Sequence, residues 1–468
     1  MFMTVLRRIL HTMIRTGKPL AMTLTIVLSA CVHADGLFTF AFPGELRVDY
    51  GDVAFGTERP RFVGMTTNLD FRVCDVMPEG DRTRVVGLRY DEDRQSAEVW
   101  TALTTDVLDF SQARRLFRLP RPDNRWLAGD VVLAGGHVVL LICDQGRPAV
   151  KGHRFHCFSG QLDGTGWKRR NDAPIYRGQD AFGLAWDKEN KRFINYQTAF
   201  QKRPKRYADN MGNDVRRVLH IRTSPDGLAW TPGGSFGVAG PYLPEDQLIT
   251  PDEEDPGELE FYKFRPMKLA DFWAGGMVNY VPQPTGLPRS GHLPHGPFLN
   301  CEWWVSRDGM KWERPFRHTS DFEGVLFKFC HFAHPPIPVR GEYRWLADEE
   351  VYALHPDRMF FIACRANAEV TTPVLHPVGG PMMLQAGFES VRLGRKSDLR
   401  QGYLMVELRT ADDQPIDGFP KEHCRFLPSD KTAFPLRWNG TPLPDPTPRQ
   451  GIRLKLYFRD MRIYSLRY

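Results

Sequence analysis

Apolar residues along this chain come in short runs, and turn-forming residues interrupt them at close intervals. Near the C-terminus, Ile452, Leu454, Leu456 and Phe458 alternate with Arg, Lys and Tyr. This alternation is typical of a strand with one buried face. Elsewhere Gly, Pro, Asn and Asp bound runs of similar length, and few segments show the period of a helix. The pattern predicts an all-β protein.

A short motif recurs and divides the chain into repeats. Residues 224–230 (SPDGLAW) and 306–312 (SRDGMKW) are near-identical copies, and weaker copies surround Asp106 and Asp163. In each copy an Asp stands four residues before an aromatic residue, and the successive Asp residues are 57, 63 and 82 residues apart. These steps fit one four-stranded sheet per repeat, and the longest step contains the Pro- and Gly-rich insertion 282–297.

The chemistry of this motif predicts a turn and not a catalytic site. Asp-Gly makes a tight turn because Gly readily adopts a positive φ. The Asp side chain accepts hydrogen bonds from the turn amides, and the Trp begins the next strand and packs between neighbouring sheets. We therefore interpret the motif residues as structural.

Strands placed around these turns give five repeats. An acidic residue stands at the start of each expected inner strand: Asp70, Asp130, Asp180, Glu260, and Glu349 or Glu350. The fifth repeat is expected to use 351–354 and 359–364, closed by residues before Phe62. Five sheets arranged radially bury their edges against each other. The sequence thus predicts a five-bladed β-propeller over residues 35–372.

The pattern changes after Pro373. Residues 402–410 and 452–458 alternate clearly between apolar and polar positions, as half-buried antiparallel strands do. We predict a β-sandwich over 373–468, with a boundary that is uncertain by about ten residues because turn signals locate element ends only roughly.

The first 34 residues have the pattern of an export signal. Basic residues precede an apolar run over 20–30, which is too short to span a bilayer and has the length of a signal core. The run ends in Leu-Ser-Ala-Cys, which resembles a lipobox and would place a lipid on Cys31. Cleavage after Ala34 is the alternative. Both predict an exported protein that is periplasmic, secreted, or an outer-membrane lipoprotein whose contact with the membrane is through the lipid alone.

Charge and cysteine content narrow the function classes. The net charge is +6 over 468 residues, and the basic run 202–206 is interpreted as a solvated loop, so no nucleic-acid partner is expected. Apart from Cys31, seven cysteines show no C-x-x-C spacing, and most stand in apolar runs. We interpret them mainly as small buried apolar residues, although one or two disulfides would suit an exported chain.

The Ser-x-Asp-Gly-x-x-Trp turns, together with the segment 180–198 and its Trp186-Asp187 pair, resemble propeller proteins of glycoside hydrolase families 32 and 43. The tail resembles the C-terminal sandwich of uncharacterised bacterial members, through the pieces 400–404, 417–419, 438–440 and 459–465. The resemblance covers about 130–468 and implies a carbohydrate substrate.

The resemblance also implies roles for the acids. Asp180 matches the mid-propeller Asp and Glu260 the general acid, while Asp130 and Asp70 compete for the early nucleophile or base, with Asp75 as a further alternative. Glycoside hydrolysis needs an acid and a base or nucleophile, and their separation decides whether the enzyme retains or inverts. The sequence leaves that outcome open. For each acid, the structural alternative is a strand-end carboxylate that bonds turn amides.

Sugar rings would be held by aromatic and basic residues near these acids. The principal candidates are Trp273, Tyr262, Trp303 and Arg265; Phe261, Trp304 and Arg222 are further candidates. Most aromatic residues of a propeller belong to its core, and this is the structural alternative for each of them.

Two histidine clusters resemble metal-ligand spacing: His153, His156 and Cys157, and Cys330, His331 and His334. Residues i and i+3 of a strand point to opposite faces, so a shared metal would need a bent loop. No metal or cofactor is expected, and a structural calcium ion is not indicated. The common nucleotide-binding, serine-nucleophile and zinc-protease motifs do not occur.

The leading hypothesis is an exported glycoside hydrolase that cleaves a poly- or oligosaccharide by carboxylate acid/base catalysis. The alternative is a non-catalytic carbohydrate-binding surface lipoprotein that has kept the propeller. A protein-binding propeller is a third, weaker hypothesis. Several carboxylates converging on one open cavity would favour the enzyme, and a single acid would favour the binding protein.

Overall fold

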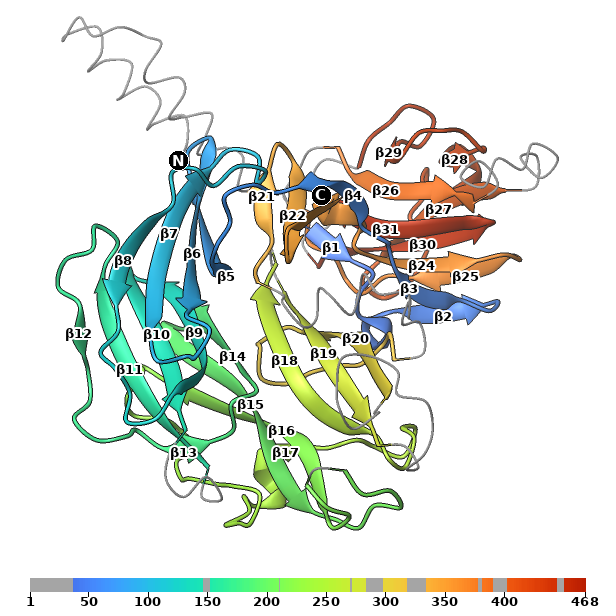
Figure 1. The fold of residues 1–468 in the computed structure, drawn as a ribbon. Coiled ribbons are helices and arrows are strands. Elements are labelled where there is room, and N and C mark those ends of the chain that lie inside the picture. The colour runs from blue at the N-terminus through green and yellow to red at the C-terminus, as the bar shows by residue number, and fades with distance from the viewer. Residues whose placement is uncertain are drawn as a thin grey trace, which may run out of the picture. The chain divides into compact units, whose positions relative to one another are not determined.

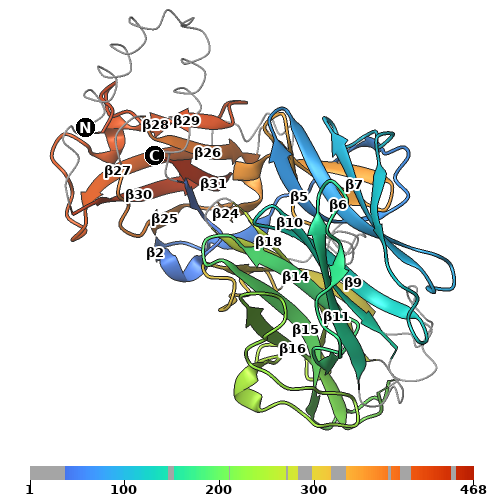
Figure 2. The same cartoon turned by 90° about the vertical axis from the view of Figure 1, so that its left-hand side faces the viewer.

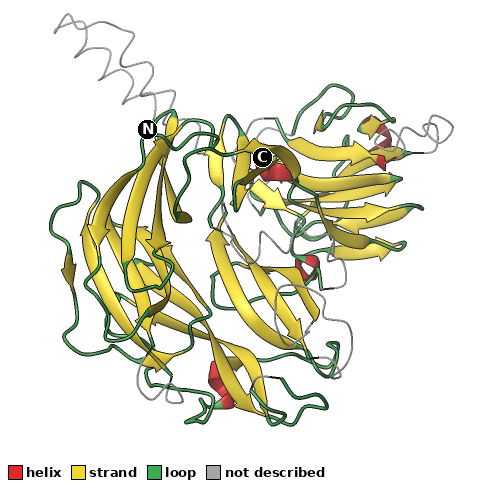
Figure 3. Ribbon diagram, in the orientation of Figure 1, coloured by secondary structure: helices red, strands yellow, loops and turns green. Residues whose placement is uncertain are grey.

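Strands dominate the computed structural model, and the described helical turns are short 3-10 segments (Figure 3). The expectation of an all-β protein is therefore confirmed. The structure describes the following residues: 37–145, 152–209, 211–269, 272–282, 298–317, 334–377, 381–389, 402–443 and 450–468. Within these ranges, no helix is long and apolar enough to cross a membrane.

The chain divides into two compact units. One comprises residues 41–43 and 54–362, and the other comprises 1–40, 44–53 and 363–468. The boundary at 362 lies close to the expected one at 373. The unit to which the N-terminal residues belong differs from expectation, because part of the stretch before residue 54 belongs with the C-terminal unit.

The larger unit contains, among its described residues, five antiparallel sheets that follow each other along the chain (Figure 1). The first four comprise β5 (Arg72–Glu79), β6 (Arg82–Tyr90), β7 (Ala97–Thr104) and β8 (Arg114–Arg118); β9 (Trp126–Ala134), β10 (His137–Asp144), β11 (His153–Gln161), β12 (Lys168–Arg169) and β13 (Arg177–Gly178); β14 (Phe182–Asp187), β15 (Arg192–Lys202), β16 (Val215–Ser224) and β17 (Leu248–Ile249); and β18 (Glu260–Lys268), β19 (Trp273–Val281) and β20 (Phe298–Ser306).

The fifth sheet corrects the expected strand assignment. It has the order β21 (Ile337–Val339), β22 (Glu342–Ala347), β23 (Glu350–Leu354) and β4 (Arg61–Met65). Residues 360–364 form β24, which is not part of this sheet. The acid pair at 349–350 therefore stands at the turn before the third strand and not at an inner-strand start. β21 was missed because the sequence of residues 318–333, which precede it, contains no turn motif.

An apolar layer fills the space between each pair of neighbouring sheets. Leu140 and Phe158 pack on the first sheet through Val86 and Val99, and equivalent clusters join the second to the third sheet and the third to the fourth. Trp303 and Trp345 share a cluster between the fourth and fifth sheets. A further cluster joins the fifth sheet back to the first. The five sheets therefore form a closed ring.

The Asp-Gly motifs are confirmed as turns with a shared hydrogen-bond pattern. Asp226 Oδ1 accepts from the backbone N–H groups of Leu228 and Ala229 at 2.8 and 2.9 Å, and Trp230 Nε1 donates to the Gly227 carbonyl at 3.0 Å. The copy at Asp308 repeats these bonds at 2.8, 2.8 and 3.1 Å.

The degraded copies keep part of this geometry. At Asp106 the backbone N–H of Leu108 donates to Oδ1 at 2.9 Å, and Val107 has a positive φ of 67°, close to the 78° of Gly227 in the full motif. Asp163 Oδ1 accepts from the Thr165 N–H at 2.7 Å. The carboxylate is thus the conserved physical element of the turn, and the glycine is replaceable.

The smaller unit is built from two antiparallel arrangements of strands. One has the order β2 (Arg47–Tyr50), β25 (Ala368–Thr371), β30 (Ile452–Arg459), β27 (Tyr403–Thr410) and β28 (Arg425–Phe426). The other contains β29 (Ala433–Pro435), β26 (Met383–Phe388), β31 (Met461–Arg467) and β1 (Leu37–Thr39). The pairing of β1 with β31 and of β2 with β25 explains why the N-terminal stretch belongs here.

Candidate functional site

The first strands of the five sheets surround one axis of the larger unit. Residues of β5, β9, β14, β18 and β21 line a single cavity, and Figures 1 and 2 show β9, β14 and β18 side by side in the same unit. The side chains that point inward from these strands are therefore brought together although they are far apart in sequence. The expected acids can be located against this frame.

Asp130 lies inside the ring and is paired with arginine. Its side chain is 2% exposed, it forms an ion pair with Arg265 of β18, and its Oδ1 lies 3.8 Å from Arg72 Nη2 of β5. The Leu184 N–H of β14 donates to its Oδ2 at 2.9 Å. Asp130 therefore ties four neighbouring strands together, as a buried carboxylate with compensating partners.

Cations outnumber carboxylates around this residue. Lys263 of β18 lies close enough to Asp130, Arg265 and Arg72 to interact with them electrostatically, and burial together with the two guanidinium groups pushes its pKa well below the usual value. Arg265 also has its pKa lowered by burial. Two guanidinium groups, those of Arg72 and Arg265, therefore lie beside the single carboxylate of Asp130.

Glu260 is enclosed in a second group of ion pairs. Its Oε1 lies 2.7 Å from Lys205 Nζ and its Oε2 lies 2.6 Å from Arg217 Nη1, while its own side chain is 0% exposed. Both cations also bind Asp209, which balances the charge. Glu260 does not face an open funnel as expected, because it is buried and both carboxylate oxygens are bonded to buried cations; its role as general acid stays a prediction.

The basic run 202–206 is also corrected by this group. Lys202, Arg203 and Arg206 are exposed, but Lys205 turns inward and is buried. This burial was not expected, because no motif marks Asp209 and Glu260 as partners of Lys205. Lys205, Asp209 and Arg217 are thus residues that sequence reasoning missed.

Asp70 lies at the end of the ring where the first strands begin. It borders a cavity of about 400 Å³, to which Arg72, Arg89, Tyr90 and Glu349 also contribute. Its Oδ2 accepts from Arg89 Nη1 at 2.5 Å, and the Asp70 side chain is 52% exposed. Of the four acids predicted for catalysis, Asp70 is the one that reaches this cavity.

The turn between β22 and β23 supplies further carboxylates. Asp348 and Glu349 are exposed and line the same cavity as Asp70. Glu349 was expected to begin an inner strand; it reaches the cavity from a turn instead. Glu349 is therefore a cavity residue, but a turn and not an inner strand positions it.

His334 forms part of the inner wall of this cavity. Its Nε2 accepts from the Leu346 N–H at 3.0 Å, so Nδ1 carries the proton and donates to the Pro335 carbonyl at 2.7 Å. Burial lowers the pKa of His334 to about 4. The imidazole of His334 is therefore neutral, and its two hydrogen bonds link the segment before β21 to β22.

Asp180 is exposed and stands just before β14, as expected. It interacts electrostatically with His153, Tyr262 and Lys263, which places it on the same side of the ring interior as these groups. It does not line the cavity that holds Asp70.

The predicted sugar-binding residues separate into core and cavity positions. Trp303 is buried in the apolar layer between the fourth and fifth sheets, and Trp304 is buried between the third and fourth. The expectation that Trp303 binds sugar is wrong, because its ring is enclosed by Phe360 and its neighbours. Tyr262 is half-buried and its ring lies 5.8 Å from the Arg217 guanidinium. Arg265 is committed to Asp130.

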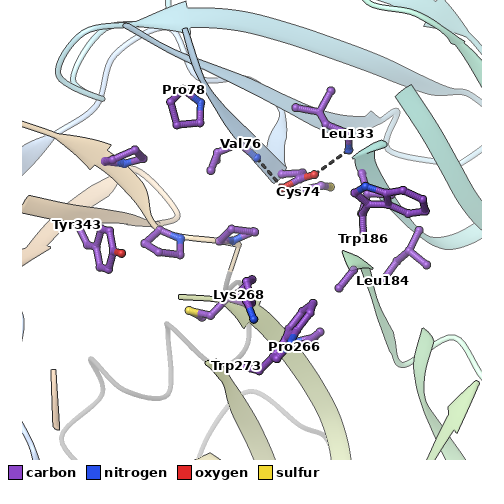
Figure 4. A pocket seen from close by; sticks show the side chains of 17 residues that line it. Cys74, Val76, Pro78, Leu133, Leu184, Trp186, Pro266, Lys268, Trp273 and Tyr343 are labelled. Carbon is purple, nitrogen blue, oxygen red and sulfur yellow. Dashed lines mark hydrogen bonds between the residues drawn. The ribbon is translucent and has the colours of Figure 1, made fainter. Parts of the chain in front are cut away.

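A second cavity of about 360 Å³ lies where the first strands end (Figure 4). Trp273 borders this cavity, although most of its ring is buried. Asp75, the alternative early acid, also lines it. The two dashed bonds in Figure 4 are those that its carboxylate accepts from Val76 and Leu133.

The histidine cluster in β11 has partners within the protein. His156 Nδ1 accepts from Arg169 Nη2 at 2.6 Å, and its Nε2 lies 3.4 Å from Asp144 Oδ2. Among the described residues, no group of three or more His, Cys, Asp and Glu side chains could hold a metal ion. Cys330, His331 and the lipidation candidate Cys31 lie outside the described residues. The six described cysteines are free and buried.

No family model matches the chain, and no curated protein matches it. The solved structures that are similar to it include a thermostable family-43 glycoside hydrolase (10% identity, 66% of this chain and 87% of the other, TM-score 0.34). They also include a GH32 β-fructofuranosidase from Bombyx mori (9%, 87% and 93%, 0.36) and an endo-arabinase from Bacteroides thetaiotaomicron (9%, 68% and 99%, 0.34). Families 32 and 43 are the two that the sequence motifs resemble. With TM-scores below 0.5, the likeness carries no argument about activity.

Proposed function

We propose that the five sheets are the blades of a β-propeller that binds a carbohydrate without depending on the acids expected for hydrolysis, and that the smaller unit is a β-sandwich. The binding site is the cavity of about 400 Å³ at the end of the ring where the first strands begin. Binding sites of this size hold small ligands in proteins generally. Several polar side chains there are available to sugar hydroxyl groups.

The observation that carries this proposal is the pairing of Glu260 and Asp130 with buried cations. A general acid must hold a proton and deliver it to the glycosidic oxygen. Glu260 is closed off by Lys205 and Arg217, and Asp130 by Arg265. Two of the four expected catalytic carboxylates are therefore part of the framework.

The cavity offers both donors and acceptors. Arg89 donates, and Asp70 and Glu349 accept. A sugar hydroxyl is both a donor and an acceptor, so such a mixed lining suits it.

Hydrolysis by a different pair is the second candidate function. Asp70 and Glu349 line the same cavity from different sheets. Two carboxyl groups about 5 Å apart would support a retaining mechanism, and a separation of roughly 6.5–9.5 Å an inverting one. The ion pair between Asp70 and Arg89 counts against a nucleophile that is free in the absence of ligand.

The wild type and a small set of variants distinguish carbohydrate binding from hydrolysis. The full chain is tested for binding and for release of reducing ends on a panel of neutral and acidic oligosaccharides. We expect binding that Arg89→Ala weakens about ten-fold, as the loss of a charged hydrogen bond implies, and no release of products. The exposed residue Arg118 on β8 offers a matched control, Arg118→Ala. Product release that Asp70→Asn and Glu349→Gln abolish would establish the hydrolase instead.

We further propose that the chain is exported and carries a lipid on Cys31. The motif before Cys31 supports this proposal. Metabolic labelling with a radioactive fatty acid in a bacterial host should label the wild type and not Cys31→Ser. An unlabelled protein whose N-terminus begins after Ala34 would show ordinary signal cleavage.

A further inference from the structure

The cavity of about 360 Å³ is separate from the proposed saccharide site. It lies where the first strands end, and it shares no lining residue with the cavity around Asp70. Residues from all five first strands or their flanking turns contribute to it, among them Leu133, Trp186 and Lys268 (Figure 4). The ring of sheets therefore encloses a hollow at each end.

A bulge in β5 brings a carboxylate into this second cavity. The register of β5 on β6 shifts between Val73 and Asp75, and bulges re-aim side chains at functional sites. The Asp75 carboxylate accepts from the backbone N–H groups of Val76 at 2.8 Å and of Leu133 at 2.7 Å. In the described part of the chain these amides are its partners, and no cation pairs with it.

Asp75 differs in this respect from the other inward-facing acids. Asp130 and Glu260 each form ion pairs with buried cations. Asp75 has none, and burial raises its pKa to about 7. A carboxyl group that is fixed by the backbone and faces a cavity can exchange hydrogen bonds with a ligand at little cost, because no internal ion pair must break.

Most of the residues that line the cavity are apolar or aromatic. Trp186 and Tyr343 are half-buried and border it, and several prolines complete the lining. Lys268 is drawn aside, since its Nζ lies 3.3 Å from Glu189 Oε2 and 5.6 Å from the centre of the Trp273 ring. The cavity thus combines aromatic surfaces with a carboxyl group, Asp75, at a defined position, as small-molecule sites do.

We propose that this cavity is a second binding site, specific for an uncharged hydroxylated ring of one or two sugar units. The apolar walls would cover the C–H faces of the ring, and Asp75 would bond its hydroxyl groups. The volume of about 360 Å³ is near the lower end of ligand-site volumes, which excludes a long chain held inside. The inference does not depend on the proposed site around Asp70.

The test uses the full chain and a panel of neutral monosaccharides and disaccharides, with binding measured by saturation-transfer NMR and calorimetry. We expect at least one sugar whose affinity falls about ten-fold in Asp75→Ala and in Trp186→Ala and is unchanged in Asp70→Ala and Arg89→Ala. Near-UV circular dichroism establishes that each variant is folded. If Asp75→Ala does not fold, Trp186→Phe and Asp75→Asn decide the question.

Three outcomes separate this inference from the proposed function. Loss of all sugar binding in the Arg89 and Asp70 variants alone would overturn the second site and leave the first. Loss in the Asp75 and Trp186 variants alone would do the reverse. An alkylamine that binds in place of every sugar, with an affinity that rises as the pH passes about 7 and Asp75 ionises, would overturn the assignment of the ligand.

Discussion

Lys205 Nζ lies 2.7 Å from Glu260 Oε1, and neither side chain has any exposed surface. The two residues are 55 positions apart in sequence, so the loop that carries Lys205 is fixed to the first strand of the fourth sheet. An ion pair of this kind is costly to bury and costly to break. In this ion pair Glu260, which was expected to act as a general acid, connects two segments of the chain.

Glu260→Gln should therefore act on stability. The substitution leaves two cations facing a neutral amide, and breaking one partner of a buried pair costs about 3–5 kcal/mol. We expect a lower free energy of unfolding in urea, with sugar binding at low temperature unchanged. Glu253→Gln, at an exposed position of the same region, is the control. A Glu260→Gln protein of native stability that had lost an activity would mean that Glu260 is catalytic after all.

The two full Asp-Gly turns should contribute equally and independently. Asp226→Ala and Asp308→Ala each remove the acceptor of two backbone N–H groups. We expect each to lower the free energy of unfolding by about 1–2 kcal/mol, and the double variant to show the sum, because the turns share no partner. Chemical denaturation measures this, with the exposed Glu92→Ala as reference. Effects that fail to add would indicate that the sheets between the turns are coupled.

His334 should make the protein less stable in mild acid. Its pKa is about 4 in the folded protein, against an ordinary value of 6.5. The unfolded chain therefore binds a proton more readily between about pH 4 and 6.5, so stability is lost as the pH falls through this range. In His334→Gln this part of the slope should vanish. His220, whose pKa is also lowered to about 4 by burial, would retain its own share.

The ionisation of Asp75 should lower stability as the pH rises, which is opposite to the effect of His334, and the two pH ranges overlap. Its folded pKa of about 7 exceeds the ordinary 3.8, so the folded state holds the proton more tightly and stability falls as the pH rises from about 4 to 7. Asp75→Asn removes one acceptor and lowers stability at every pH, so the slope is the readout. Between pH 5 and pH 8 the unfolding free energy of the variant should therefore rise more, or fall less, than that of the wild type, because the opposing contributions of His334 and His220 remain. An unchanged slope would show that Asp75 is ionised throughout.

Much of the fold could be predicted from local patterns. The Asp-Gly turns were recognised as turns because their hydrogen bonds lie within a few residues, and the copies at Asp226 and Asp308 form the same bonds. The strand 452–458 alternates as β30 does, with Ile452, Leu454 and Leu456 buried. The fifth sheet was expected to be closed from the beginning of the chain, and β4 (Arg61–Met65) closes it, but β21 and β22 were missed because no Asp-Gly motif marks them.

The sequence by itself determined the strands, the turns and the presence of an acid near each inner strand, since these depend on neighbours in the chain. Only the tertiary structure decided what each acid does. Asp130 and Glu260 meet cations from distant segments, Asp70 meets a cavity, and Asp75 meets backbone amides alone. The charge and function of a carboxyl group are set by the groups within a few ångström of it, and in a closed ring of sheets those groups come from every part of the chain.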